Sequence, residues 1–194
     1  MRRVHNIEAE SYRILRELVD LSRLGPLSRA VAERVIHASA DPEYADTLVL
    51  DETALEGGLE ALRRGAPIVT DAHMVAAGIT IRDALCFVSD PRAKELSEDR
   101  GITRSAAGFR LAAEEAGEGA VWVVGNAPTA LFGLVDMDAR PALVVGLPVG
   151  FVGAAESKEK LVSSRLPAVA NRGPKGGSAV AAAAVNALLY FEEG

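Results

Sequence analysis

The sequence has little cysteine and few aromatic residues, and it contains no long apolar run. Its one cysteine, Cys86, excludes a disulfide within the chain and is typical of a reducing compartment, so we expect a cytoplasmic location. No apolar run approaches the roughly 20 residues of a membrane-spanning helix, and the N-terminus becomes polar too early for a signal peptide. A net charge of −6 disfavours nucleic acid and anionic membranes as partners, but a local Arg and Lys cluster could still bind a small anion.

The motifs of several enzyme classes are also missing. The histidines His5, His37 and His73 do not have the spacing of a zinc site, so we expect no bound metal. There is no GxGxxG dinucleotide fingerprint and no GxSxG elbow, and GPKGGS lacks the GK[ST] of a phosphate loop. The chemistry that remains uses hydrogen bonds, positive charge and one titrating histidine, without a redox cofactor.

Composition and periodicity indicate one α/β domain over residues 1–194. Hydrophobic residues make up 49% of the chain, enough to bury a substantial core. Short apolar runs alternate with helical patterns, which is typical of a mostly parallel central sheet with helices on both faces. We therefore predict a three-layer fold of about five strands. The predicted strands are 66–70, 85–89, 120–124, 142–145 and 167–170.

Helices are predicted between and before these strands from their apolar spacing and their caps. The clearest ranges are 7–21, 26–40, 52–64, 91–100 and 104–116, with an alanine-rich helix at the end of the chain. We predict that Asp71 caps the short helix after the first strand and that Thr103 caps the helix that begins at Arg104.

Glycine-bearing turns follow the later predicted strands. They read GNAPTA (125–130), GLPVGFVGAAES (146–157) and NRGPKGGS (171–178). A strand that enters such a turn and then a helix leaves free backbone N–H groups directed at one point. Ligands of open parallel sheets bind beyond the carboxyl ends of the strands. We therefore expect these turns, with Thr70 and Asp71, to surround one crevice for an anionic or strongly polar ligand.

His37 lies near the end of the helix predicted at 26–40, and it has two interpretations. It can interact with the negative end of the helix or pair with Glu33 one turn earlier. Alternatively, it can act as a general acid, because histidine titrates near neutral pH. On the residues alone the first interpretation is favoured, and nothing local decides between them.

Arg104 lies in the first turn of its predicted helix, where a cation opposes the helix dipole by roughly 0.3–1 kcal/mol. An anion bound between the helix N-terminus and the guanidinium would remove that conflict. The alternative is an ordinary solvent-exposed arginine. Arg172 and Lys175, which precede the last helix, raise the same question.

Four other polar residues carry weaker signals. Asn126 and Ser178 either cap helices or face the crevice. Lys158, in GAAESK, belongs either to an ordinary surface turn or to a polar cluster that shapes the crevice. Ser11 interrupts the apolar stripe of the first helix, which is more often a tolerated small residue than a ligand contact.

Six blocks along the chain resemble the precorrin-8X methylmutase family, including its cobalt-precorrin-8 members. The blocks are ERVIHASAD (33–41), APIVTDAHMVAAGI (66–79), ITRSAAG (102–108), VGNAPTALF (124–132), PALVVGLPVGFVGAAESKEKL (141–161) and GPKGGSAVAAAAVNALL (173–189). Together and in this order they are far more specific than any one of them.

The resemblance implies an isomerase of vitamin B12 biosynthesis that moves a methyl group from C-11 to C-12 of a ring-contracted macrocycle. The product is hydrogenobyrinic acid or, with cobalt, cobyrinic acid, and no cofactor is needed. His37 matches the family histidine regarded as the proton donor. The resemblance also implies a homodimer with the product near the subunit interface. The substrate-binding candidates are Ser11, Thr80 and Arg104, which match family positions, and Asn126, Lys158, Arg172 and Ser178 from the crevice.

The segment TIRDAL (80–85) is shorter than the glycine-containing hairpin of many relatives, which puts Thr80 in question, and NRGPKGGS has an irregular lead-in. Two other functions are weighed. A tetrapyrrole carrier would keep the pocket without catalysis, but the intact His37 counts against it. A nucleotide or phosphate enzyme would need the missing lysine–serine motif.

Overall fold

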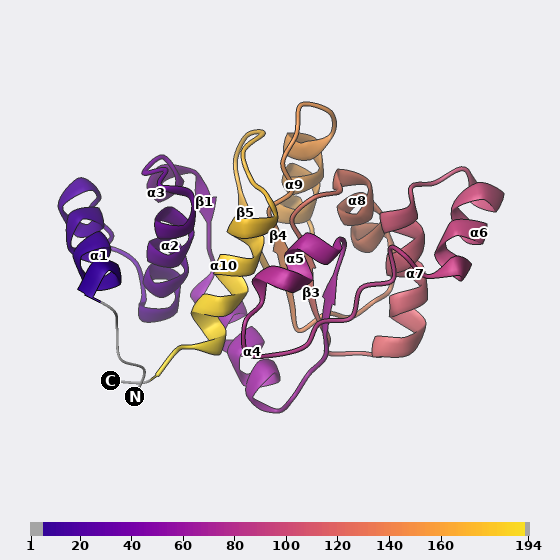
Figure 1. Cartoon of the computed structure of the whole chain (residues 1–194), viewed down its shortest axis with the longest axis horizontal. Coiled ribbons are helices and arrows are strands. Elements are labelled where there is room, and N and C mark those ends of the chain that lie inside the picture. The colour runs from indigo at the N-terminus through magenta and orange to yellow at the C-terminus, as the bar shows by residue number, and fades with distance from the viewer. Residues whose placement is uncertain (1–5, 193–194) are drawn as a thin grey trace.

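The computed structural model describes residues 6–192, which form a central sheet between two layers of helices (Figure 1). The strands are β1 (Leu48–Val49), β2 (Ile68–Thr70), β3 (Val121–Val124), β4 (Leu143–Gly146) and β5 (Ala168–Asn171). The helices are α1 (Asn6–Leu18), α2 (Pro26–Ser39), α3 (Tyr44–Thr47), α4 (Glu52–Arg63), α5 (His73–Gly78), α6 (Pro91–Arg100), α7 (Arg104–Ala116), α8 (Pro128–Asp136), α9 (Ala154–Ser163) and α10 (Ser178–Leu189). The predicted α/β class is confirmed.

The sheet has the strand order β1-β5-β4-β3-β2. Strands β2 to β5 are parallel, and only β1 runs antiparallel, with its Val49 opposite Ala170 of β5. The carboxyl ends of the parallel strands therefore meet at one edge, and the loops that leave them touch. Gly150 N donates to Pro174 O at 3.2 Å, and Gly177 N donates to Leu147 O at 2.8 Å.

Alternate residues of the buried strands face two different cores, as strand geometry requires. On β3, Val121 and Val123 join the core formed with α2, α4 and α10. Trp122 and Val124 join the other core, where Phe109 of α7 meets the Trp122 ring edge-on at 4.9 Å between centroids. Both faces of the sheet are therefore covered, which explains the continuous apolar runs in the sequence.

One predicted strand, 85–89, is wrong. Leu85 makes a single bridge with Val69, through hydrogen bonds to Ile68 and Thr70 backbone groups, and the chain then leaves the sheet. The segment instead packs on α7, where a side chain on Gly108 would lie 3.1 Å from the Phe87 backbone. The fifth strand is β1, which is too short and too exposed to give a period-two pattern.

Helix bounds agree with prediction within a few residues, and one predicted cap is wrong. Thr103 does cap α7, accepting from Ala106 N at 3.3 Å. Asp71 does not cap α5, whose N-cap residue is Ala72 with no side-chain hydrogen bond. Of the helices in residues 6–192, none combines the length and the apolar character needed to cross a bilayer.

Candidate active site

His37 lies in the last turn of α2, where α1 packs against it. Its Nδ1 is 2.9 Å from Ser11 Oγ, and its ring stacks on Tyr12 with centroids 4.8 Å apart and planes inclined by 15°. The ring is half-buried. Pairing with Glu33, considered from the sequence, does not occur, because the Glu33 carboxylate binds Arg16 at 2.8 and 3.0 Å. The imidazole is thus oriented by one hydrogen bond and one aromatic face.

Thr80 follows α5 and is held against the end of α10. Its backbone N donates to Asn186 Oδ1 at 3.2 Å, and its Oγ1 lies 2.8 Å from the Tyr190 hydroxyl. The amide of Asn186 also donates to Gly78 O at 2.7 Å, which fixes the start of the 80–85 connection. The side chain of Thr80 therefore has a defined position.

A cavity of about 230 Å³ lies between α1, α2 and the end of α10, and neither His37 nor Thr80 lines it directly. Tyr12, which stacks on His37, and Tyr190, which contacts Thr80, both line it. The guanidinium of Arg34 lies over the Tyr190 ring at 5.3 Å, a cation–π geometry. Sequence reasoning missed Arg34, although its position one turn before His37 on α2 placed it on the same helix face.

Arg104 lies far from His37 within one chain. It is the first residue of α7 and is exposed, and within residues 6–192 its side chain makes no hydrogen bond or ion pair. Figure 1 shows α1 and α2 at one end of the molecule and α6 and α7 at the other, with the sheet between them. A single chain therefore does not bring the two strongest candidates together.

The turn after β3 is already occupied by a carboxylate of the protein. Asp71 is 1% exposed and accepts from the N–H groups of Gly125, Asn126 and Ala127 at 3.0, 2.9 and 2.6 Å. Burial raises the pKa of Asp71, and the three N–H donors oppose part of that rise. The expectation that these N–H groups bind a ligand is wrong, and the side chain of Asn126 remains exposed beside them.

The loop between β5 and α10 is held from inside by Lys158. This lysine is 1% exposed, and its Nζ donates to Asn171 Oδ1 at 3.0 Å and to Lys175 O at 2.5 Å. Arg172 is exposed, and its backbone N binds Thr47 O at 2.9 Å. Ser178 is the first residue of α10 rather than its cap, which is Gly177. The structure thus directs Lys158 to the loop backbone instead of to solvent.

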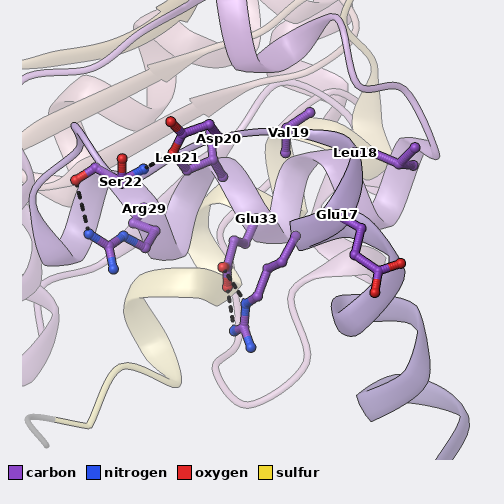
Figure 2. Close-up of a pocket in the computed structure, with 9 residues that line it drawn as sticks. Glu17, Leu18, Val19, Asp20, Leu21, Ser22, Arg29 and Glu33 are labelled. Atoms are coloured by element: carbon purple, nitrogen blue, oxygen red, sulfur yellow. Dashed lines mark hydrogen bonds and ion pairs between the residues drawn. The ribbon is translucent and has the colours of Figure 1, made fainter.

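Figure 2 shows a different cavity, of about 540 Å³, near the end of α1. Its walls mix charged side chains with the apolar Leu18, Val19 and Leu21, and Arg29 donates to Ser22 O at 3.4 Å. The lining residues are Arg16 to Ser22, Arg29 and Glu33, and none is a predicted site residue. Among the residues that the structure describes, no cluster of three or more His, Cys, Asp or Glu could hold a metal ion.

Comparisons of sequence and of structure with known proteins all match the same family over most of the chain. The model of the family described as precorrin-8X methylmutase matches residues 6–191. The cobalt-precorrin-8 methylmutase of Methanothermobacter thermautotrophicus is 46% identical over 197 residues, covering 97% of this chain and 94% of that protein. The precorrin-8X methylmutase of Pseudomonas aeruginosa is 43% identical, with coverages of 96% and 95%. The crystal structure of precorrin-8X methylmutase from Thermus thermophilus has a TM-score of 0.85 at 37% identity, covering 94% of this chain and 93% of that one.

Proposed function

The chain belongs to the precorrin-8X methylmutase family, and from this premise we propose that His37 is the proton donor of the isomerisation that it catalyses. The enzyme is an isomerase of cobalamin biosynthesis. Its substrate is precorrin-8X or cobalt-precorrin-8, and it moves a methyl group from C-11 to C-12 to give hydrogenobyrinic or cobyrinic acid. The observation that carries the role of His37 is its contact with Ser11 and Tyr12.

The proposed reaction requires a correctly positioned proton donor and no other reactant. His37 donates a proton to a nitrogen of the macrocycle, which makes the conjugated ring more electron-poor and eases migration of the methyl group. The methyl group leaves C-11 and bonds to C-12 of the same molecule, so no oxidant, reductant or methyl donor takes part. As the ring tautomerises it returns a proton to His37, and the net reaction is an isomerisation.

Ser11 supports this role because a hydroxyl can donate to Nδ1 or accept from it. Its hydrogen bond with His37, 2.9 Å long, can therefore persist in both protonation states of the ring. Stacking on Tyr12 restricts rotation of the imidazole. A ring held in this way donates its proton from a fixed position, which favours a unimolecular step.

The acidic side arms of the substrate call for positive charge and hydrogen-bond donors. We assign these contacts to Thr80, which contacts Tyr190 in the wall of the 230 Å³ cavity, and to Arg104, Asn126, Arg172 and Ser178 at the carboxyl edge of the sheet. Thr80 and Ser178 have fixed backbones, and the arginines and Asn126 are exposed. Salt bridges to exposed arginines are screened by salt, so binding should be salt-dependent.

A homodimer would bring the separated halves of this site together. Phe151 and Val152, in the loop after β4, are 99% and 89% exposed, an apolar tip that a second copy could cover. Arg104 and His37 lie at opposite ends of one chain, so Arg104 of one subunit could approach His37 of the other. Sedimentation analysis tests the dimer. In a mixture of His37→Ala and Arg104→Ala subunits, a mixed dimer would hold one intact site, so activity at low substrate concentration above that of either variant alone tests the shared site.

The role of His37 is tested by the variant His37→Ala with precorrin-8X, followed by absorption spectroscopy. Turnover should fall by about 100-fold or more, the range of general acid catalysis, while hydrogenobyrinic acid still binds. His73→Ala is the matched control, because His73 is exposed and its ring forms a side-chain hydrogen bond with Ser89. Full turnover in His37→Ala would refute the proton-donor role. Binding of both precorrin-8X and cobalt-precorrin-8 without conversion of either by the native protein would identify a carrier.

A further inference from the structure

Lys158 is a buried cation that the proposed chemistry does not use. It projects from α9 into the interior at 1% exposure, and burial lowers the pKa of its ammonium to about 8. An ammonium group is costly to bury unless acceptors replace its water. Here the acceptors are Asn171 Oδ1 at 3.0 Å and Lys175 O at 2.5 Å. Its partners therefore lie at the end of β5 and in the loop that follows.

Asn171 extends the same network to the loop backbone. Its Nδ2 donates to Arg172 O at 3.1 Å and to Lys175 O at 3.0 Å. Lys175 O thus receives hydrogen bonds from both side chains. Lys158 and Asn171 together hold the carbonyl groups of the loop at its beginning and near its end.

The held loop packs directly against the loop after β4. At Gly176 a side chain would lie 2.3 Å from Leu147 O, so only glycine allows this approach. Gly177 N donates to Leu147 O at 2.8 Å, and α10 begins at the next residue, Ser178. Ser178 lies beside the turn that follows β3. A Cβ atom added to Gly125 in that turn would be 2.8 Å from the Cα atom of Ser178.

The outer side of the loop is tied to the helix that carries His37. The ammonium of Lys175 pairs with Asp41 at 2.6 Å and also with Glu43, in the segment that follows α2. These pairs are partly exposed and contribute little to stability alone. The loop therefore bridges the carboxyl edge of the sheet and the end of α2.

We propose that Lys158 is a positioning residue, which acts through Asn171 and Lys175 O to hold the 172–177 loop so that Arg172 and Ser178 meet the substrate. This assignment replaces the direct substrate contact expected of Lys158, and it rests on the proposed substrate-binding role of Arg172 and Ser178. Lys158 touches neither the substrate nor the reacting atoms. Its removal should therefore affect substrate affinity more than the chemical step.

The test compares Lys158→Met with Lys160→Met, because Lys160 lies on the same helix but is a surface residue paired with Asp136. For Lys158→Met we expect KM for precorrin-8X and Kd for hydrogenobyrinic acid to rise about tenfold, with kcat within about twofold of the native value. Trypsin should cut after Arg172 and Lys175 faster, at a temperature where circular dichroism shows the variant folded. Lys160→Met should match the native protein in all four measurements.

Unchanged KM with unchanged cleavage of the loop overturns the proposal. A loss of kcat at constant KM also overturns it, because it would place Lys158 in the chemical step. Faster cleavage at sites throughout the chain, without selectivity for the loop, would indicate general destabilisation and would contradict the assignment as well.

If Lys158→Met does not fold, Asn171→Asp decides the question. This variant keeps an acceptor for the ammonium but removes the two N–H bonds to Arg172 O and Lys175 O. The same rise in KM is expected, and a native KM would contradict the proposal. If the native enzyme converted neither precorrin-8X nor cobalt-precorrin-8, the proposed function would fail, but product binding and trypsin cleavage would still decide the role of Lys158.

Discussion

The turn after β3 and the loop after β5 are both organised around a buried charged side chain, and the two charges have opposite signs. Asp71 binds three backbone N–H groups of residues 125–127. Lys158 binds one backbone carbonyl and one side-chain amide oxygen. Both residues are 1% exposed. The Asp71 carboxylate occupies the backbone N–H groups before α8 that a ligand would otherwise bind. The Lys158 ammonium binds the 172–177 loop from the interior of the protein.

The difference lies in what remains if the charge is removed. Without Asp71, three N–H groups at the start of α8 lose their acceptor. Without Lys158, Lys175 O still accepts from Asn171 Nδ2 at 3.0 Å. Asp71 should therefore matter most for folding and Lys158 most for the shape of the loop.

The largest effect is expected for Asp71→Ala. Leaving three buried or half-buried donors without a partner should lower the free energy of unfolding by about 3–5 kcal/mol, measured by urea denaturation. The matched control is Asp51→Ala, because Asp51 caps α4 through one hydrogen bond, to Ala54 N at 2.9 Å. That control should lose about 1 kcal/mol. Equal losses in the two variants would show that Asp71 is only an ordinary cap.

The next effect is the pH dependence of stability caused by Lys158. Burial lowers its pKa to about 8 from 10.5, so between these values the folded state binds fewer protons than the unfolded state. The free energy of unfolding should rise with pH across this window, relative to Lys158→Met, by at most about 3 kcal/mol. Denaturation of both proteins at several pH values measures it. A constant difference would mean that the ammonium is well solvated in the fold.

The buried anion should give the opposite slope. Because burial raises the pKa of Asp71 above 3.8, the folded state binds the proton more tightly than the unfolded state. The free energy of unfolding of the native protein should therefore fall, relative to Asp71→Asn, as pH rises above 3.8. The same denaturation series in acid measures this fall, and a rise would reverse the assigned effect of burial.

The smallest effect on stability is expected at Arg104, which belongs neither to the turn after β3 nor to the loop after β5. Arg104→Ala should change the free energy of unfolding by less than about 0.5 kcal/mol, since the side chain is exposed. It should weaken binding of hydrogenobyrinic acid, and the loss should shrink as salt concentration rises. Arg110, exposed on the same helix, gives the control variant Arg110→Ala. Equal affinities in the two variants would remove Arg104 from the binding site.

Much of the fold follows from local sequence patterns. The parallel strands and the helices flanking them were predictable because apolar runs and caps such as Thr103 act within a few residues. The segment 85–89 has the composition of a strand, but packing against Gly108 of α7 decides its path. β1 could not be predicted, because a two-residue strand has no periodicity of its own.

The candidate site was predictable in part. The six blocks along the chain indicated the family, and the comparisons confirmed it. The contact between His37 and Ser11 joins residues 26 positions apart, so only the packing of α1 on α2 could show it. The roles of the site residues in substrate binding and proton transfer stay predictions until the variants are measured.

The sequence by itself determined the class of fold, the alternation of strands and helices, and the family. The first two depend on short-range apolar patterns, and the family is identified by short sequence blocks. The tertiary structure alone decided which charges face inward. The sequence predicted Asp71 to be a helix cap and Lys158 to lie at the surface or in the crevice. Both side chains are instead buried, and each binds backbone groups distant in the sequence. The physical reason is that a polar group must find its hydrogen-bond partner wherever folding places one, and sequence spacing does not contain that position.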